Sequence, residues 1–350
     1  MDEFAKGSPE DRREAFQETS AQKGVSFQIA EKDFWVCWTL RRLFGLEKFD
    51  KYFVFKGGTS LSKVYNVIQR FSEDIDVAIE REFLVETKDG DFIGLSSKQR
   101  ERNVEELDKR CRTMIETEIL TQLKQAIALQ LGASGWSLKL DADDPYRQTI
   151  LFEYPKSTSG EDKVGVQYVR PIVKIEFGAR PTNEPSETHV IKPYVAELFP
   201  QLFNDPTVEL KVLAAERTFW EKATILHELY NRPPEYIGRD RSSRHYYDLY
   251  QLIRHDHGWS ALERVDILKS VVANKNAYFY RGGAKYDETL IGKFHLLPNE
   301  RAMGGILSDY NKMAEMIFGD PPKFENILSE LGRLEPIMNE RITASESNSS

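Results

Sequence analysis

The stretch "FKGGTSLSKVYNVIQRFSEDIDVAIE", residues 55–80, decides how the N-terminal half of the chain folds. Its two adjacent glycines follow the short apolar run "YFVF", which is typical of a buried strand. The next segment, 59–71, carries apolar residues at helical spacing. Residues 74–80, "DIDVAIE", then alternate polar and apolar side chains, as a strand with one exposed face does. The stretch therefore predicts a strand, a glycine turn, a helix and a second strand.

The rest of the chain extends this pattern. Residues 96–130 have the charge and period of a long amphipathic helix, and "QTILFEYP" (148–155) and "VRPIVKIEFG" (169–178) indicate strands. Beyond residue 180 the chain is rich in proline and polar turns, which predicts that the sheet ends there and that a boundary falls near residue 206. We expect an α+β fold. A mixed β-sheet with flanking helices (1–206) precedes a helical C-terminal domain (207–340), and a disordered tail (341–350) follows.

Composition sets limits on location and partners. The 350 residues carry a net charge of −8, so contact with nucleic acid requires a local basic patch. Only two cysteines occur, which favours a reducing compartment. The polar N-terminus carries no signal-peptide pattern, and no apolar run approaches the roughly 20 residues of a membrane span. We expect a cytoplasmic protein with no membrane contact.

The glycine pair, Gly57 and Gly58, suits a phosphate. Glycine adopts backbone angles that other residues avoid, and a turn before a helix presents backbone N–H groups to an anion. Hydroxyl and ammonium groups flank the pair, which gives as candidate phosphate-binding residues Lys56, Gly57, Gly58, Thr59, Ser60 and Lys63. The alternative is a structural turn without a ligand.

Paired carboxylates stand on the second predicted strand. Alternate residues of a strand face the same side, so Asp74 and Asp76 point together. Two such carboxylates repel each other unless a cation lies between them, and magnesium binds carboxylate and phosphate oxygens together. If the later strand that carries Glu176 lies beside them, three carboxylates share one sheet face, which suits two metal ions. The alternative is a solvated polar face.

This combination resembles the nucleotidyltransferase core of the DNA polymerase beta superfamily. Successive motifs also resemble the AbiEii/AbiGii toxin family of nucleotidyltransferases, over about residues 28–339: "QIAEKDFWV", "FKGGTSLSKVY", "FSEDIDVAI", "ERTFWEKATILHE" and "SRHYYDLYQL". The resemblance implies that an NTP is held between the glycine turn and the helical domain. It also implies two Mg²⁺ ions on Asp74, Asp76 and Glu176, and release of pyrophosphate. Biologically it implies the toxin of a type IV-like toxin–antitoxin or abortive-infection (phage defence) system with a cognate antitoxin, and MenT-type relatives suggest the tRNA 3′ end as acceptor.

Two C-terminal motifs add candidate site residues. Lys222 falls inside the apolar helical stripe of "ERTFWEKATILHELY", where a lysine must extend to the surface or meet an anion such as triphosphate. The family's motif lysine maps onto Lys222, and Arg217 could support phosphate or simply pair with Glu221. The family's functional aspartate maps onto Asp248, which we expect to orient Lys222 or another group of the site. The alternative is a surface ion pair between Asp248 and Arg244, the latter also a candidate for binding phosphate.

Other functions stay open at this point. The acceptor could be a protein or a small molecule, or the chain could bind GTP or another NTP without transferring it. Arg232, Arg239, Arg241 and Arg244 could contact RNA phosphates or form a solvated loop.

Overall fold

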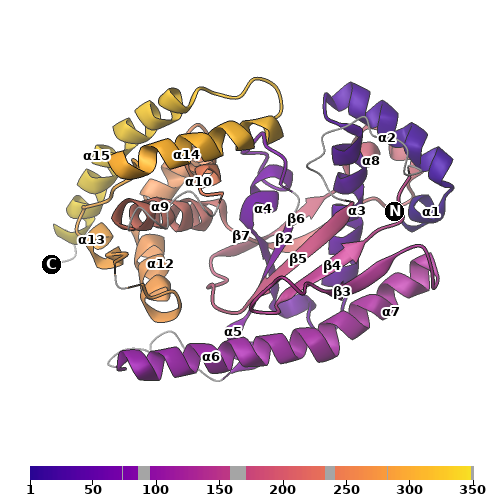
Figure 1. Ribbon diagram of the computed structural model, residues 1–350, viewed down its shortest axis with the longest axis horizontal. Coiled ribbons are helices and arrows are strands. Elements are labelled where there is room, and N and C mark those ends of the chain that lie inside the picture. The colour runs from indigo at the N-terminus through magenta and orange to yellow at the C-terminus, as the bar shows by residue number, and fades with distance from the viewer. Residues whose placement is uncertain (73, 86–94, 158–170, 233–240, 282, 348–350) are drawn as a thin grey trace.

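The computed structural model describes residues 1–72, 74–85, 95–157, 171–232, 241–281 and 283–347. A seven-stranded mixed sheet lies at its centre, with the order β3-β4-β5-β2-β1-β7-β6 (Figure 1). The strands are β1 (Phe53–Lys56), β2 (Asp74–Ile79), β3 (Ser137–Leu140), β4 (Thr149–Glu153), β5 (Ile172–Gly178), β6 (Ser186–Ile191) and β7 (Val208–Leu213). β2 runs parallel to β5 and β1 runs parallel to β7, while the remaining neighbours are antiparallel.

One face of the sheet is covered by helices from the N-terminal half. α3 (Phe27–Phe44) packs on β5 and β7, and α7 (Leu120–Leu131) packs on α3 and β3. Phe55, Ile75 and Val77 point into this layer and are buried with it. Besides α4 (Gly57–Lys63) and α6 (Ser97–Met114), the N-terminal part contains the helices α1 (Asp2–Lys6), α2 (Pro9–Lys23), α5 (Arg81–Leu84) and α8 (Tyr194–Leu198), with short 3-10 turns η1 (Asp50–Tyr52) and η4 (Pro200–Leu202).

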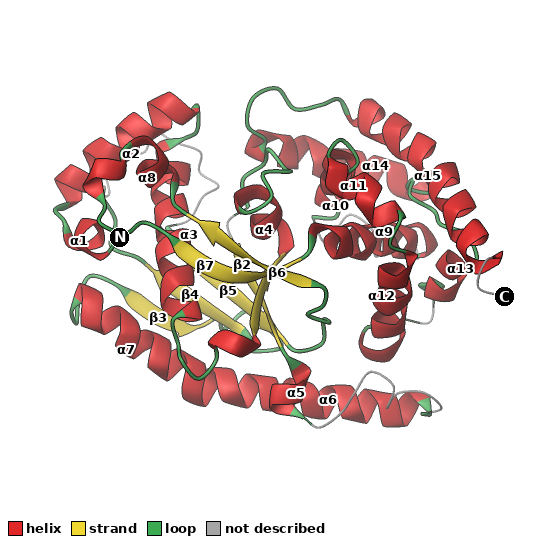
Figure 2. Ribbon diagram, turned by 180° about the vertical axis from the view of Figure 1, so that it is seen from behind, coloured by secondary structure: helices red, strands yellow, loops and turns green. Residues whose placement is uncertain are grey.

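The long amphipathic helix predicted over 96–130 is confirmed. It consists of α6 (Ser97–Met114), the π-helical turn η3 (Ile115–Ile119) and α7, and it forms a rod along the lower edge of the molecule (Figures 1 and 2). Ser96 caps its N-terminus in a reciprocal capping box with Gln99. The buried residues Leu107 and Cys111 attach it to the core.

The C-terminal part is helical and has a core of its own, which includes Trp220, Leu226, Tyr246 and Leu268. Its elements are α9 (Ala215–Asn231), α10 (Ser243–Leu252), α11 (Asp256–Leu262), α12 (Val265–Tyr278), α13 (Tyr286–Leu290), α14 (Glu300–Met313), η6 (Ala314–Met316) and α15 (Phe324–Ser347). Within the described ranges, no helix combines the length and apolarity needed to cross a membrane.

Three expectations differ from the structure. The sheet does not end near residue 180: β6 and β7 follow, and β7 lies between β1 and β6, beyond the boundary expected at 206. Both strands alternate side chains between faces and pair with each other over their whole length, a pattern that the neighbouring prolines obscured.

The helix expected over 59–71 is also shorter. α4 (Gly57–Lys63) ends early, and Asn66 adopts a left-handed conformation with φ 51°, which ends helical pairing. The expected disordered tail from residue 341 is wrong up to Ser347, because α15 continues there and Ile342 is buried in the C-terminal core.

Candidate active site

Charged side chains form a row across three adjacent strands. Lys56 on β1 is the register partner of Asp76 on β2, and Asp76 is the register partner of Glu176 on β5. Residues opposite each other in register point to the same face of a sheet. Asp74 belongs to this face by its two-residue spacing from Asp76. The predicted neighbourhood of the three carboxylates is therefore present, on the face opposite the layer that α3 covers.

The glycine turn is fitted against one of these carboxylates. Gly57 has a φ of 81°, and a Cβ built on it would lie 2.0 Å from Oδ2 of Asp76. A Cβ on Gly58 would lie 2.7 Å from Oγ of Ser72 and 2.8 Å from a guanidinium nitrogen of Arg70. Only glycine fits at either position without displacing these groups.

The hydroxyls beside the turn brace it. Oγ1 of Thr59 donates to the backbone carbonyl of Asp74 and lies within hydrogen-bond distance, 3.0 Å, of Oγ of Ser72. Oγ of Ser60 donates to the carbonyl of Gly57 at 2.9 Å, and Ser60 is fully buried. In this structure these two predicted phosphate-binding residues fix the shape of the turn and its distance from β2.

The carboxylate row alters the acidity of Asp76. Burial raises the pKa of Asp76 to about 7, and the charges of Glu176 and Asp74 act in the same direction. The cations Lys56 and Arg244 oppose this rise, which places Arg244 near the row. Because burial and two like charges disfavour the ionised form of Asp76, a cation bound beside it would favour that form.

A buried ion network lies on the same side, contributed by the C-terminal helices. Asp248 on α10 is fully buried and pairs with Nζ of Lys222 on α9 at 2.7 Å. Its two oxygens also accept from Nε and a terminal nitrogen of Arg70, at 2.7 and 2.8 Å. Burial alone would raise the pKa of Asp248, but Arg70 and Lys222 outweigh it and hold that pKa well below its usual range. The expected contact between Lys222 and Asp248 is thus present, and the alternative of a surface pair between Arg244 and Asp248 is wrong.

The comparisons with known proteins follow the same motifs. The family model described as "Nucleotidyl transferase AbiEii toxin, Type IV TA system" matches residues 38–330. The chain belongs to this family. The AbiEii assignment makes it a nucleotidyltransferase of a type IV toxin–antitoxin family.

Solved structures include a similar chain, the nucleotidyltransferase toxin MenT4 from Mycobacterium tuberculosis H37Rv. It is 16% identical, the match covers 95% of this chain and 98% of that one, and the TM-score is 0.46. A search of the curated proteins finds no match.

Whether this AbiEii-family site suits a metal depends on its donor atoms. Within the described residues, no group of three or more His, Cys, Asp or Glu side chains converges as a metal site. Glu176 is turned toward Lys174, whose Nζ lies 2.6 Å from Oε1 of Glu176. Magnesium, however, is commonly held by one or two carboxylates together with substrate phosphates. The placement of Asp74 and Asp76 on one face of β2 and the raised pKa of Asp76 fit such an ion.

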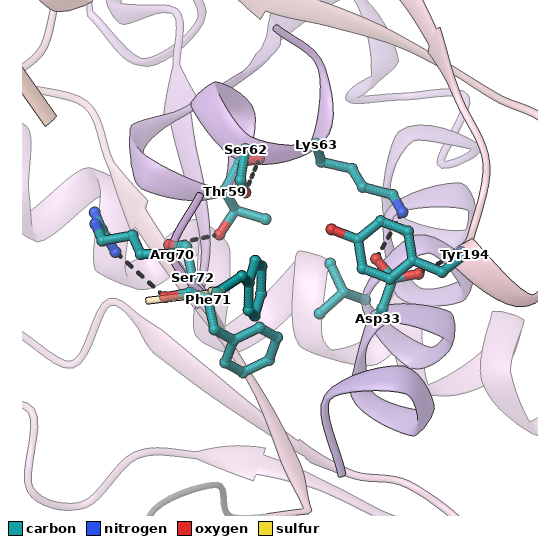
Figure 3. A pocket seen from close by; sticks show the side chains of 10 residues that line it. Asp33, Thr59, Ser62, Lys63, Arg70, Phe71, Ser72 and Tyr194 are labelled. Atoms are coloured by element: carbon teal, nitrogen blue, oxygen red, sulfur yellow. Dashed lines mark hydrogen bonds and ion pairs between the residues drawn. The ribbon is translucent and has the colours of Figure 1, made fainter. Parts of the chain in front are cut away.

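Two predicted phosphate-binding residues of this family member lie elsewhere. Lys63 forms a buried pair with Asp33 at 2.6 Å, and its Nζ lies 3.7 Å from the centre of the Tyr194 ring (Figure 3). Arg217 is fully buried and donates to the carbonyl of Glu184 at 2.7 Å. We correct both to structural residues, because protein groups already hold their cationic ends.

Arg217 still acts on the site through a neighbour. Its Nε lies 3.4 Å from Oε1 of Glu221, and Oε2 of Glu221 lies 3.3 Å from Nζ of Lys56. Arg217 and Glu221 therefore help to set the position of Lys56 beside Asp76.

Sequence reasoning missed Arg70. It pairs through two nitrogens with Asp248 and also approaches Gly58, so it joins the glycine turn to the C-terminal helices. The available signal was a basic residue just before "FSEDID". Of the arginines considered for RNA, Arg232 pairs with Glu228 at 2.7 Å, and Arg239 falls outside the described residues.

Proposed function

We propose that this AbiEii-family nucleotidyltransferase uses Mg²⁺ to transfer a nucleotide from an NTP to the 3′ end of tRNA. The observation that carries the proposal is the register of Lys56, Asp76 and Glu176 on one sheet face, with the Gly57 turn against Asp76. This places a cation, a carboxylate row and a turn without side chains beside one another. Those are the groups that phosphoryl transfer requires.

The NTP phosphates bind along the turn in this proposal. Backbone N–H groups of Gly57 and Gly58 contact the triphosphate, since no side chain at these positions blocks its approach. Lys56, Lys222 and Arg244 supply positive charge from β1, α9 and α10. Asp248 and Arg70 orient Lys222 without contacting the substrate.

Asp74 and Asp76 would hold Mg²⁺, and Glu176 would complete a second metal position or act as the base. When bound, the metal stabilises the negative charge that develops on the α-phosphate and the leaving pyrophosphate. The acceptor hydroxyl oxygen forms a bond to the α-phosphorus, and the bond from that phosphorus to the bridging oxygen of the β-phosphate breaks. Pyrophosphate carries away the electron pair of that bond, and the hydroxyl proton passes to the carboxylate row.

The acceptor and the cellular role rest on the family. A tRNA acceptor follows the resemblance to MenT-type toxins, and the family description supports a cognate antitoxin. We propose a cytoplasmic toxin that serves in phage defence by abortive infection.

The test uses purified protein, Mg²⁺, each common NTP labelled at the α-phosphate, and total bacterial RNA. A labelled band at tRNA size is the expected result, and the NTP that gives it is the substrate. Labelled protein or a labelled small molecule in a cell extract, without labelled RNA, would replace tRNA as the acceptor. Tight NTP binding without pyrophosphate release in any extract would contradict transfer altogether.

A further inference from the structure

A pocket outside the candidate active site lies next to the segment that follows the C-terminal end of β5. A cavity of about 440 Å³ opens between the N-terminal turns of α6, the C-terminal end of α12 and the segment that follows β5. α6 and α12 contact each other here, and both ribbon views show them side by side (Figures 1 and 2). We refer to it as the α6–α12 pocket, with the lining residues Arg100, Tyr146, Arg180, Phe279, Tyr280 and Arg281.

Aromatic rings in the pocket are unusually exposed. Tyr280 is 58% exposed and Tyr146 is 56% exposed. The guanidinium of Arg100 lies 5.4 Å from the centre of the Tyr280 ring, and that of Arg180 lies 5.3 Å from the Tyr146 ring. Exposed rings flanked by guanidinium planes are the surfaces on which unpaired nucleobases stack.

Arginines outnumber carboxylates among the side chains that line the pocket. The charged side chains of its lining are three arginines and Glu101. Each arginine is anchored through part of its guanidinium: Arg180 pairs with Asp108, Arg281 with Glu228, and a terminal nitrogen of Arg100 donates to the carbonyl of Asn276. A guanidinium has five N–H donors, so such anchoring leaves donors for phosphate. Within the described residues, Nε of Arg100 is buried and no hydrogen-bond acceptor reaches it.

Two elements connect the pocket to the catalytic residues. Glu176 lies on β5, and Arg180 follows four residues later, at most about 13 Å along an extended chain. Burial is the largest cause of the lowered pKa of Lys275 on α12, and the charges of Glu228, Glu221 and Lys56 also act on it, so Lys275 lies near these groups. Phe279 and Tyr280 directly follow the end of α12 at Tyr278. An extended nucleic-acid strand can therefore reach the pocket from the carboxylate row.

We propose that the α6–α12 pocket binds unpaired nucleotides of the acceptor RNA, next to the nucleotide whose hydroxyl is modified. Tyr280 and Tyr146 stack on the bases, and Arg100, Arg180 and Arg281 meet the phosphates. This inference rests on the proposed transfer to RNA. The pocket suits RNA better than the NTP, because in the proposed function the NTP phosphates bind at the Gly57 turn, whereas exposed rings and arginines at this second place match the further bases and phosphates of a polynucleotide.

The test measures binding without catalysis. A fluorescent single-stranded RNA of about ten nucleotides is titrated with wild-type protein and with the double variant Tyr280→Ala/Arg100→Gln, in the absence of NTP. Stacking and charge together predict that affinity falls at least about tenfold in the variant. Tyr280→Trp should retain affinity, since it keeps a ring, and an RNA duplex of the same length should bind more weakly than the single strand.

Matched controls separate this pocket from general charge and from the NTP site. Trp259→Ala and Arg301→Gln remove an exposed aromatic ring and an exposed arginine elsewhere and should leave RNA affinity unchanged. NTP affinity, measured with a fluorescent nucleotide analogue, should be the same in wild type and the double variant. Unchanged RNA affinity in a folded double variant would overturn the inference, as would no RNA binding by wild type or a matching loss of NTP affinity. Failure of the proposed function would instead appear as absent transfer by wild type, whatever its RNA affinity.

Discussion

The carboxylate of Asp76 occupies the position that a side chain on Gly57 would need, because a Cβ on Gly57 would lie 2.0 Å from Oδ2 of Asp76. Gly57 directly follows β1, and Asp76 lies on β2. These two strands are paired, with Lys56 opposite Asp76. The shape of the turn and the position of the carboxylate therefore depend on each other. A change in one should disturb phosphate binding and metal binding together.

Gly57→Ala is the first test of this dependence. The backbone at φ 81° strains any other residue, and the added methyl displaces the Asp76 carboxylate, so we expect a loss of about 1–3 kcal/mol in unfolding free energy and a strong loss of transfer. The matched control is Gly304→Ala in α14, where a Cβ meets no atom within 4 Å. It should stabilise the protein by about 0.5–1 kcal/mol and leave transfer intact. Equal effects of the two substitutions would refute the account of the turn.

Asp76→Asn should stabilise the folded protein above neutral pH. Burial and the neighbouring carboxylates raise the pKa of Asp76 from 3.8 to about 7, so the folded state holds this proton more tightly than the unfolded state. The cost to the wild type therefore develops as pH rises above about 4 and is complete above about 7. At pH 8 we expect the variant to be about 1–4 kcal/mol more stable, and the difference should vanish near pH 4. Chemical denaturation of both proteins between about pH 4 and pH 8 measures this difference in unfolding free energy.

The effect of Mg²⁺ on thermal stability is a second way to compare the wild type with the Asp76→Asn variant. At pH 8, millimolar Mg²⁺ should raise the melting temperature of the wild type, because the ion relieves the repulsion among Asp74, Asp76 and Glu176. The Asp76→Asn variant should show little rise. A similar rise in melting temperature in both proteins would contradict metal binding at this carboxylate row.

Substitutions at Asp248 and Lys222 should have different effects on protein stability and on nucleotide transfer. Asp248→Asn leaves the buried cations Arg70 and Lys222 without their carboxylate, which we expect to cost about 3–5 kcal/mol. Lys222→Met leaves Asp248 paired with Arg70, so stability at pH 7 should change far less while transfer falls. Because the folded pKa of Asp248 is depressed, its contribution is present above about pH 4 and disappears as pH falls further. A Lys222→Met protein with normal transfer would exclude this lysine from the reaction.

The lysines on either side of the turn should behave differently. Lys56 lies beside Asp76, so Lys56→Met should raise the KM for NTP by roughly tenfold. Lys63 is held by Asp33, so the double variant Lys63→Met/Asp33→Asn, which leaves no unpaired buried charge, should keep the KM of the wild type. An increased KM for NTP in the double variant would indicate that Lys63 does bind phosphate.

Local patterns in the sequence predicted the carboxylate face well. Alternation places Asp74 and Asp76 together on β2, and the parallel pairing of β2 with β5 brings in Glu176. Contacts between distant segments could not be predicted. Lys63 and Arg217 have the residue type of phosphate-binding groups, but tertiary partners on α3 and beside β6 hold them. Arg70 went unnoticed because its partner lies 178 positions away in the chain.

The most direct test of the account is the rate of nucleotide transfer by wild type and Asp76→Asn, measured side by side with the preferred NTP, Mg²⁺ and tRNA. Both proteins should be folded, and thermal denaturation checks this in the same buffer. We expect transfer by the wild type and a fall of about a hundredfold or more in the variant, since the carboxylate proposed to hold the cation is gone. Transfer by Asp76→Asn at the wild-type rate would contradict the central claim that this carboxylate row performs the reaction.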